Sequence, residues 1–283
     1  MKLVSRAKDR IDNRTCLRLN LSSIFLLILS ILFLSSCSGD SSSSLSRIKS
    51  AGQICFAVEG TYPPFNFFNS KKELVGFDVD VAKEIATRLG VKAKLVPTKW
   101  REMIPKLNAG EYDCILASMA ITDERSKQVA FSAPYYHSGA QLLVRSDATF
   151  EHPADLKNKT IGIVAGTTYE ADAKQLGANP ILYYKDDYEC LHELHLGVLD
   201  GVITDKVFGA YLKNIGKFDT KRLGPPLRKE KIALAFRKQD DALLRKINKI
   251  LKSMHKDGTL NIFISKVAQG DYNDGDLVGS GKP

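Results

Sequence analysis

Arg125 is a cation at a place where the start of a helix favours an acid. It lies in SMAITDERSKQVAFS (residues 118–132), where Thr122 has the features of an N-cap and two acids follow in the first turn. Arg125 takes the third helical position, at which Glu or Gln would complete a capping box. The partial positive charge of the helix end opposes a cation there, so we expect the guanidinium to bind an external anion. The plainer interpretation is an ion pair with a nearby surface acid such as Glu102.

The chemistry that suits Arg125 is recognition of an α-carboxylate. A guanidinium fork binds a carboxylate through two parallel hydrogen bonds, and backbone N–H groups around Ala120 and the hydroxyl of Thr168 could add to them. An α-ammonium needs a carboxylate, and Asp205 follows the predicted strand DGVIT. This set favours a zwitterion as ligand. Asp205 could instead cap the helix that follows it.

The segment AGTTYE offers a second place for an anion. Thr167 as N-cap and Glu170 three residues later have the spacing of a capping box, and the N–H groups of such a helix start attract anions. The alternative is a well-capped helix with no ligand.

Aromatic and acidic residues at other strand ends suit a cationic side chain. Tyr62 follows the first predicted strand. Trp100, the single Trp of the chain, begins a helix that follows another predicted strand. Their ring faces could sandwich a ligand side chain and would favour a cation, whose distal charge could pair with Glu59. The alternatives are core aromatics and a solvated carboxylate.

Strand and helix patterns alternate from residue 50 onward. Apolar runs are followed by segments with 3.6-residue periodicity, and a break near APYYHSG (133–139) divides them into two series. Repeated βα units predict an α/β fold with parallel or mixed sheets and helices on both faces, here in two lobes whose connecting strands return near residues 225–236. Ligands of such sheets bind beyond the carboxyl ends of the strands, so the cleft between the lobes is the expected site.

The N-terminus is predicted to be a targeting segment. Residues 1–37 hold six basic and two acidic side chains, and residues 21–34 are apolar or Ser. That length suits a signal-peptide core and is short for a membrane span. The LSSC that ends at Cys37 resembles a bacterial lipobox, in which Cys37 is lipidated, and residues 38–46 form a Ser-rich tether. An uncleaved anchor helix is the alternative. Either way, we expect an extracytoplasmic, membrane-tethered protein with no later membrane-spanning segment.

Composition argues against several other classes. The net charge is +9, but acids and bases are interspersed after the N-terminus, and no basic stripe with aromatics predicts nucleic-acid binding. No cluster of His and Cys predicts a metal, and HELH (192–195) lacks the spacing of a zinc motif. Cys55, Cys114 and Cys190 are expected to be core thiols, with a Cys55–Cys114 disulfide left open.

Several motifs together resemble the bacterial extracellular solute-binding proteins of family 3, which deliver polar amino acids to ABC importers. GFDVDVAKEIATRLG (76–90) is similar to the signature segment of that family. EGTYPPFNF, SMAITDERSKQVAFSAPYY, VAGTTYEA and DGVITD follow in the order and spacing of the family, across roughly residues 47–265. The resemblance places a carboxylate-binding Arg on Arg125, an amino-group Asp on Asp205 and a hydroxyl on Thr168. The predicted ligand-binding residues are Glu59, Tyr62, Trp100, Ser118, Met119, Ala120, Arg125, Thr168, Tyr169 and Asp205.

What the resemblance implies is a two-lobed periplasmic-binding-protein-like fold that closes over a free amino acid by hinge motion. We expect residues 47–138 and 232–268 to form lobe 1, residues 139–231 to form lobe 2, and residues 269–283 to form a flexible tail. The expected partners are an amino acid, with a cationic one favoured by Glu59, an ABC permease and a lipid anchor. The expected protein is a monomer without cofactor or metal. Ala120 replaces a hydroxyl that many members carry, so Arg125 should hold more of the carboxylate.

Other functions stay open at this point. The ligand could be a polar amino acid such as glutamine, and the protein could be the sensor domain of a separate partner. Some relatives with the implied fold are cyclohexadienyl dehydratases, which need a general acid over the ring of their substrate. The segment after Asp205 offers Lys206 but no carboxylic acid. We therefore expect a binding protein and not an enzyme.

Overall fold

The structure is a computed structural model that describes residues 43–215, 218–269 and Tyr272. The predicted signal peptide with Cys37, most of the predicted tether and nearly all of the predicted tail lie outside the described residues. Within them, no helix is both long enough and apolar enough to cross a membrane.

The sheet of lobe 1 has five strands. In spatial order they are β5 (Lys92–Pro97), β1 (Gln53–Val58), β6 (Cys114–Ile115), β14 (Ala235–Phe236) and β7 (Ala130–Phe131). Strand β1 is parallel to β5 and β6, as the alternation of strands and helices predicts, and β14 pairs antiparallel with β6 and β7. Val58 lies opposite Pro97, so the chain that follows each strand leaves the sheet at the same edge.

The sheet of lobe 2 has six strands. They are β10 (Ile181–Tyr184), β9 (Ile161–Val164), β11 (Gly201–Asp205), β8 (Tyr136–Arg145) and β12 (Thr220–Arg222) in spatial order, with β13 (Arg228–Ile232) paired to β8. Strands β9, β10 and β11 are parallel, whereas β8 runs antiparallel to β11, β12 and β13. The molecule therefore has the predicted two-lobed α/β fold.

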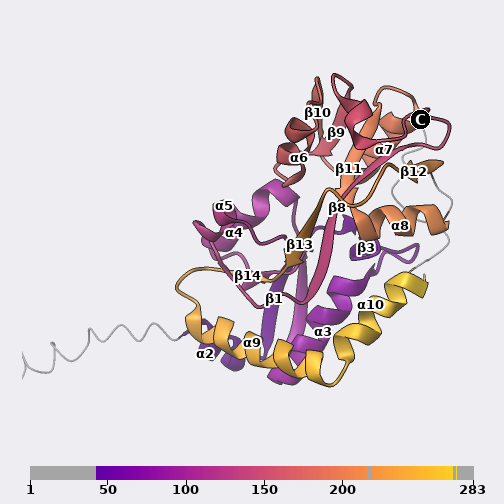
Figure 1. The fold of residues 1–283 in the computed structure, drawn as a ribbon. Coiled ribbons are helices and arrows are strands. Elements are labelled where there is room, and N and C mark those ends of the chain that lie inside the picture. The colour runs from indigo at the N-terminus through magenta and orange to yellow at the C-terminus, as the bar shows by residue number, and fades with distance from the viewer. Residues whose placement is uncertain (1–42, 216–217, 270–271, 273–283) are drawn as a thin grey trace, which may run out of the picture. The chain divides into compact units, whose positions relative to one another are not determined.

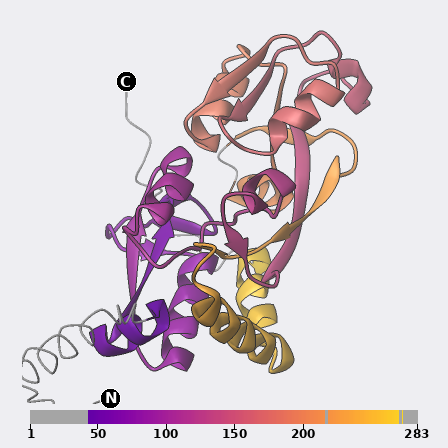
Figure 2. The same cartoon turned by 90° about the vertical axis from the view of Figure 1, so that its left-hand side faces the viewer.

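Two antiparallel strands, β8 and β13, run side by side between the lobes (Figures 1 and 2). Gly139 allows them to lie close, because a Cβ at this position would come within 2.4 Å of the Arg228 carbonyl oxygen. The predicted boundary between residues 138 and 139 falls inside β8. The apolar run KIALAFRK (231–238) predicts a single strand. This prediction is wrong, since Lys231 and Ile232 end β13 in one sheet, and Ala235 and Phe236 form β14 in the other.

Helices cover both sheets. Those of lobe 1 are α2 (Ser44–Ala51), α3 (Phe77–Leu89), α4 (Met103–Asn108), α5 (Asp123–Ser126), α9 (Asp241–Lys256) and α10 (Thr259–Gln269), with a 3₁₀ turn, η2 (Trp100–Glu102), before α4. Those of lobe 2 are α6 (Tyr169–Gln175), α7 (Asp187–His195) and α8 (Lys206–Ile215), with a 3₁₀ turn, η3 (Pro153–Leu156). Helix α2 begins at Ser44, so the tether ends before the predicted residue 46.

The residues of helix α3 and of the loop before it determine where this helix begins and ends. Val81, Ile85 and Leu89 are buried as predicted, and Gly90 ends the helix in the left-handed conformation. Its first turn has no side-chain cap. Instead, the backbone N–H groups of Phe77 and Asp78 donate to carbonyl oxygens of the preceding loop. The start of α3 is therefore fixed to that loop.

The loop in front of α3 forms a small antiparallel sheet of its own. Its strands are β2 (Thr61–Tyr62), β3 (Asn66–Phe68) and β4 (Leu74–Val75). Gly76 has φ +123°, and a Cβ there would come within 2.4 Å of the Phe65 carbonyl oxygen, so only glycine permits this approach. This small sheet holds the segment that contains Glu59 and Tyr62 against the rest of lobe 1.

Cys55, Cys114, Cys190 and the HELH segment (192–195) have structural roles. Cys114 and Cys190 are buried free thiols, as expected, and Cys55 is a half-buried free thiol. The HELH residues lie on α7, where His192 and His195 face solvent and Leu194 is buried. No group of three or more metal-ligating side chains occurs among the described residues.

Candidate functional site

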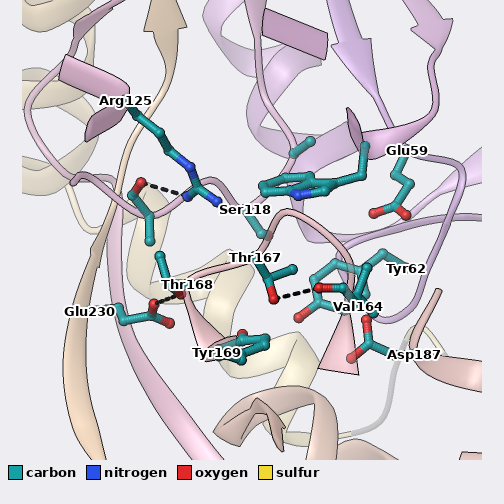
Figure 3. A pocket seen from close by; sticks show the side chains of 13 residues that line it. Glu59, Tyr62, Ser118, Arg125, Val164, Thr167, Thr168, Tyr169, Asp187 and Glu230 are labelled. Carbon is teal, nitrogen blue, oxygen red and sulfur yellow. Dashed lines mark hydrogen bonds between the residues drawn. The ribbon is translucent and has the colours of Figure 1, made fainter. Parts of the chain in front are cut away.

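A pocket between the lobes encloses about 430 Å³ of space, part of it open to solvent (Figure 3). It is lined by Glu59, Tyr62, Trp100, Ala117, Ser118, Ala120, Arg125, Val164, Thr167, Thr168, Tyr169, Asp187 and Glu230. Eight of the ten predicted ligand-binding residues are in this set; Met119 and Asp205 are not. The pocket lies beyond the ends of strands from both sheets, as the fold predicts.

Arg125 points into this pocket from α5. Its backbone N–H donates to the Oγ1 of Thr122 at 3.1 Å, which confirms Thr122 as the N-cap. Its Nη1 donates to the carbonyl oxygen of Ala120 at 2.9 Å, and its guanidinium lies 5.0 Å from the ring centre of Trp100. The expected rival partner Glu102 pairs with Lys106 instead, at 2.9 Å.

The charge of Arg125 is nearly buried and lacks a direct counter-ion. The residue is 9% exposed, and in the described part of the chain no carboxylate forms an ion pair with it. Burial lowers the pKa of the guanidinium, and the negative charge of Glu230 in the same pocket opposes that effect. A buried cation without a counter-ion favours the binding of an anionic ligand.

One carbonyl oxygen of lobe 2 receives two hydrogen bonds from lobe 1. The Nε1 of Trp100 donates to the Gly166 carbonyl at 3.2 Å, and the Nη2 of Arg125 donates to the same oxygen at 3.3 Å. Gly166 lies in the left-handed region, at φ +81°, directly after β9. The two lobes therefore contact each other through residues that also line the pocket.

The Ser and Thr hydroxyl groups of the pocket each donate to a protein acceptor. Ser118 donates to Asp78 Oδ2 at 3.0 Å, Thr168 donates to Glu230 Oε1 at 2.8 Å, and Thr167 donates to the Val164 carbonyl at 2.7 Å. The predicted capping box is wrong. Thr168, not Thr167, is the N-cap of α6, and neither side chain bonds to the helix.

Two carboxylates lie at the opposite end of the pocket from Arg125, Glu59 from lobe 1 and Asp187 from lobe 2 (Figure 3). Burial raises the pKa of Glu59 to about 8, and the charges of Asp187 and Asp186 add to this effect. Burial likewise raises the pKa of Asp187 to about 7, against a hydrogen bond from Thr204. Desolvated acids that repel each other would be stabilised by a cation between them.

Asp187 and Glu230 were missed by the sequence analysis. Asp186 and Asp187 open a helix after a predicted strand, and Asp186 is its N-cap, accepting from the Glu189 N–H at 2.9 Å. The doubled acid was the signal, because one carboxylate suffices as a cap. Glu230 lies between Lys229 and Lys231 on a strand rich in charged residues, and nothing in that pattern indicates a pocket.

Asp205 and Met119 differ from the prediction. The Oδ1 of Asp205 accepts from the backbone N–H groups of Val207 at 2.7 Å and Phe208 at 3.4 Å, so the residue caps α8. Burial raises its pKa to about 6, against the hydrogen bonds from these two backbone N–H groups. Met119 is 1% exposed and belongs to the core of lobe 1. The structure thus shows the capping role of Asp205, and its role in binding an amino group stays a prediction.

A buried carboxylate connects the two pocket loops of lobe 1. Asp78 accepts hydrogen bonds from the Oη of Tyr135 at 2.6 Å, the Nδ2 of Asn66 at 2.7 Å and the Oγ of Ser118. Asn66 Oδ1 in turn accepts from the backbone N–H groups of Glu59 at 2.8 Å and Gly60 at 2.9 Å. Asp78 therefore fixes the loop that bears Glu59 and the loop that bears Ser118, whose φ is +52°.

Known proteins with similar sequences bind amino acids. The L-cystine-binding protein TcyJ of Escherichia coli strain K12 is 34% identical over 78% of this chain and 85% of its own length. The ABC transporter arginine-binding protein 1 of the same strain is 34% identical over 74% of this chain and 88% of its own length. The histidine-binding periplasmic protein of Salmonella typhimurium is 31% identical over 80% of this chain and 90% of its own length.

Solved structures with the same fold are likewise amino-acid-binding proteins. An ancestral arginine-binding protein, solved with arginine and with glutamine, matches with a TM-score of 0.71 and 38% identity over 76% of this chain and 97% of its own. The ancestral amino acid-binding protein AncCDT-1, described as a precursor of cyclohexadienyl dehydratase, matches with a TM-score of 0.73 and 34% identity over 79% of this chain and 98% of its own. A family model matches residues 54–268. The chain belongs to the bacterial extracellular solute-binding proteins, family 3.

Proposed function

We propose that this protein is the receptor of an ABC importer for an L-amino acid with a cationic side chain. The observation that supports the cationic ligand is the charge of the pocket. Its described lining includes three carboxylates, Glu59, Asp187 and Glu230, and one guanidinium, Arg125. Glu230 is already paired with Arg228, so a ligand with a cationic side chain complements Glu59 and Asp187, and a neutral or acidic one leaves both without a cation.

The proposed pose follows the two ends of the pocket. The α-carboxylate binds Arg125, helped by backbone N–H groups at Ala120. The side chain extends past the rings of Trp100 and Tyr62 toward Glu59 and Asp187 (Figure 3). A guanidinium or ammonium between those two acids would offset their repulsion and their desolvation. We propose that the lobes close over the ligand by bending β8 and β13.

The pocket also argues against other amino acids that relatives bind. The distal end of cystine carries a carboxylate beside its ammonium, and in this pose Glu59 and Asp187 would repel that carboxylate, which arginine and lysine lack at this end. Glutamine has no charge to pair with either acid. The ancestral arginine-binding protein was solved with both arginine and glutamine, so weak binding of a polar amino acid is compatible with this fold.

Calorimetric titration at pH 7.5 with arginine, lysine, histidine, glutamine, glutamate and cystine tests the proposal. We expect micromolar or tighter binding of arginine or lysine and at least tenfold weaker binding of the others. Tight binding of glutamine, glutamate or cystine with none of arginine or lysine would contradict the cationic ligand.

We also propose that Cys37 bears the lipid anchor, which would keep the receptor at the outer face of a bacterial membrane. The support is the sequence alone, since Cys37 lies outside the described residues. Metabolic labelling with an alkyne fatty acid should mark the protein, and Cys37→Ser should abolish the label and release the protein from membranes. Labelling that survives this substitution would exclude Cys37.

A dehydratase activity is the second candidate, because AncCDT-1 is described as a precursor of such an enzyme. Lys206, the group after Asp205, lines a different hollow beside Tyr211 and Ile264, away from the pocket. A general acid would have to be Glu59 or Asp187. We propose that neither acts in this way, and that incubation with prephenate yields no phenylpyruvate above the uncatalysed rate.

A further inference from the structure

Helix α9 carries a row of cations on the side that faces solvent. Its other side packs into the core of lobe 1 through Leu243, Ile247, Ile250, Leu251 and Met254. Opposite that side, at spacings of four, three and four residues, lie the exposed side chains of Arg245, Lys249, Lys252 and Lys256. A helix turns once in 3.6 residues, so these spacings place the four side chains in one narrow band. These four residues form the α9 stripe.

The α9 stripe lacks the acids that pair with cations on other helices. On α3, α4 and α6 a cation pairs with an acid one turn earlier, namely Arg88 with Glu84, Lys106 with Glu102 and Lys174 with Glu170. Among the described residues, no carboxylate forms an ion pair with a member of the stripe, and Asp241, the single acid in the sequence of α9, precedes all four. Like charges one turn apart destabilise a helix, and an anionic partner would remove that repulsion.

The start of the described chain lies beside the start of α9. Ser44, the first residue of α2, donates its hydroxyl proton to Asp240, the N-cap of α9. Both helices lie at the end of lobe 1 that is away from lobe 2 (Figure 1). Helix α2 leads into the amino end of β1, whereas the pocket lies beyond the carboxyl ends of the strands. The α9 stripe is therefore a surface separate from the pocket.

The proposed lipid anchor would bring this end of the protein to a membrane. Six residues, 38–43, separate Cys37 from Ser44. A chain of that length spans at most about 25 Å, whatever its path. Helix α9 has 16 residues and is therefore about 24 Å long. A lipid on Cys37 would hold the start of α9 within about one helix length of the headgroups, so a helix lying flat could bring all four cations to the membrane surface.

We propose that the α9 stripe binds the anionic headgroups of a phospholipid membrane. Phosphate oxygens accept hydrogen bonds from guanidinium and ammonium groups, and each cation near such a surface adds to the attraction. The apolar side of α9 belongs to the core of lobe 1, so the helix adsorbs by charge and does not insert. The choice of a membrane over other anionic partners rests on the proposed anchor at Cys37, because the short reach of the chain sets what the stripe can meet.

Cosedimentation with vesicles tests this surface in the absence of a lipid anchor. The protein from Ser38 onward keeps both sheets and the described helices of both lobes. We expect it to bind vesicles of phosphatidylcholine with about 30% phosphatidylglycerol, and to bind pure phosphatidylcholine at least tenfold more weakly. About 0.5 M NaCl should release it, because salt screens exposed charges. The combined variant Arg245→Ala, Lys249→Ala, Lys252→Ala and Lys256→Ala should bind the anionic vesicles about tenfold more weakly, or less.

The matched control removes the same charge from exposed positions of lobe 2. It combines Lys157→Ala, Lys159→Ala, Lys174→Ala and Lys185→Ala, and it should bind anionic vesicles as the wild type does. An equal loss in both variants would mean that only the net charge matters and would contradict the proposal. Alanine favours helices, and the like charges of α9 are removed, so the α9 variant should melt no lower than the wild type.

Acetylation of lysines in the wild-type protein needs no variant. Anionic vesicles should slow the labelling of Lys249, Lys252 and Lys256 severalfold, as read by mass spectrometry, and leave Lys157 and Lys159 unchanged. Equal protection of the two sets, or none, would overturn the proposal.

Two further results would exclude a lipid surface as the partner. The first is equal binding of the wild type to anionic and neutral vesicles, or binding to neither. The second is tighter binding of polyglutamate than of anionic vesicles, which would indicate an acidic protein as the partner of the stripe. The protein used here carries no lipid, so these results are independent of whether Cys37 is labelled by a fatty acid.

Discussion

The two ends of the pocket handle buried charge in different ways. At one end Arg125 stacks on Trp100 and donates to two carbonyl oxygens, and Glu230 is paired with Arg228. At the other end Glu59 and Asp187 face each other from different lobes, and among the described residues neither has a cationic partner. The first end is organised before a ligand arrives, and the second is completed by one. This difference suggests general recognition of amino acids at one end and selection of the side chain at the other.

The largest expected effect is at the organised end. Arg125→Ala should weaken every α-amino acid that binds by about 3 kcal/mol or more, because a buried charge-assisted pair is lost. Calorimetry with each ligand measures the loss. Lys127→Ala is the control, since this exposed cation of the same segment pairs, within the part of the chain that the structure describes, only with Glu124, at 3.4 Å. A similar small loss for both variants would make Arg125 structural.

Asp78→Asn should come next, with a loss of about tenfold to a hundredfold for all ligands. Three donors point at this carboxylate, and the Asn66 amide cannot turn because its oxygen is held by two backbone N–H groups. The oxygen of the new amide can accept from Asn66 and Ser118, but its NH2 group then faces Tyr135, whose hydroxyl loses the acceptor it had. Faster hydrogen exchange at Glu59, Gly60 and Ser118 should accompany the loss.

Asp80→Asn is the matched control for that change. Asp80 lies in the same first turn of α3, but it pairs with Lys266 at 3.2 Å and does not line the pocket. Its substitution should leave affinity and exchange at the pocket loops unchanged. Equal effects of the two variants would mean that only the stability of α3 matters.

Glu59→Gln should act only at the selective end. We expect arginine to weaken by roughly tenfold and a neutral amino acid to bind as well as before or better, since an unpaired acid is removed. Calorimetry with arginine and with glutamine gives the ratio of the two affinities. If both ligands change equally, Glu59 does not select for charge.

The acidity of Glu59 makes that end dependent on pH. Its pKa is raised from the ordinary 4.5 to about 8, so between these values the folded, ligand-free protein holds the proton more tightly than the unfolded chain does. The resulting stability is fully present below about pH 4.5 and is lost as the pH rises through about 8. The melting temperature without ligand should therefore fall over this range, and less steeply in Glu59→Gln.

The same acid links binding to proton release. A cationic ligand prefers the ionised carboxylate, so arginine should bind more tightly as the pH rises from about 6 to 8. Calorimetry at pH 7 in two buffers of different ionisation enthalpy should show protons leaving on binding. No difference between the buffers would mean that Glu59 is already ionised in the free protein.

Trp100→Phe should have the smallest effect. It keeps the ring over Arg125 and removes the hydrogen bond to the Gly166 carbonyl, so we expect a loss of about twofold to fivefold that is the same for all ligands. Small-angle scattering without ligand should show a more open average. Unchanged scattering and affinity would mean that this bond does not hold the lobes together.

Much of the fold followed from local patterns. The 3.6-residue periodicity of α3, its glycine end and the Thr122 cap are all properties of neighbouring residues, and the structure confirms them. The apolar run around Ala233 was continuous, so no period could show that it passes from one sheet to another. Helix α10 was missed. The segment DDALLRKINKILKSMHKDG (240–258) predicts one long helix that stops before Gly258, and no element was predicted after it.

The pocket residues likewise divide into those that local sequence patterns could predict and those that they could not. Arg125 was identified because its charge conflicts with its own helix, and Trp100 because it is single and follows a strand. Asp187 and Glu230 belong to the pocket only because distant segments meet there. The role of Asp205 was ambiguous in the sequence, because an acid at the end of a strand suits a ligand and a helix cap equally well. In the structure, its Oδ1 accepts from the first turn of α8.

The position of Glu230 on β13 has a mechanical consequence. Just beyond it, the Lys231 carbonyl accepts from the Ile121 N–H at 2.9 Å and the Ile232 carbonyl accepts from the Tyr135 N–H at 2.9 Å, so the strand is clamped to lobe 1 at that point. On its other side Arg228 is tied to Asp172 in lobe 2. The lobe rotation that we propose would therefore bend β13 in the two or three residues between these anchorages. Glu230 lies at that bend, so we expect a ligand that displaces it to act on the pivot of the rotation.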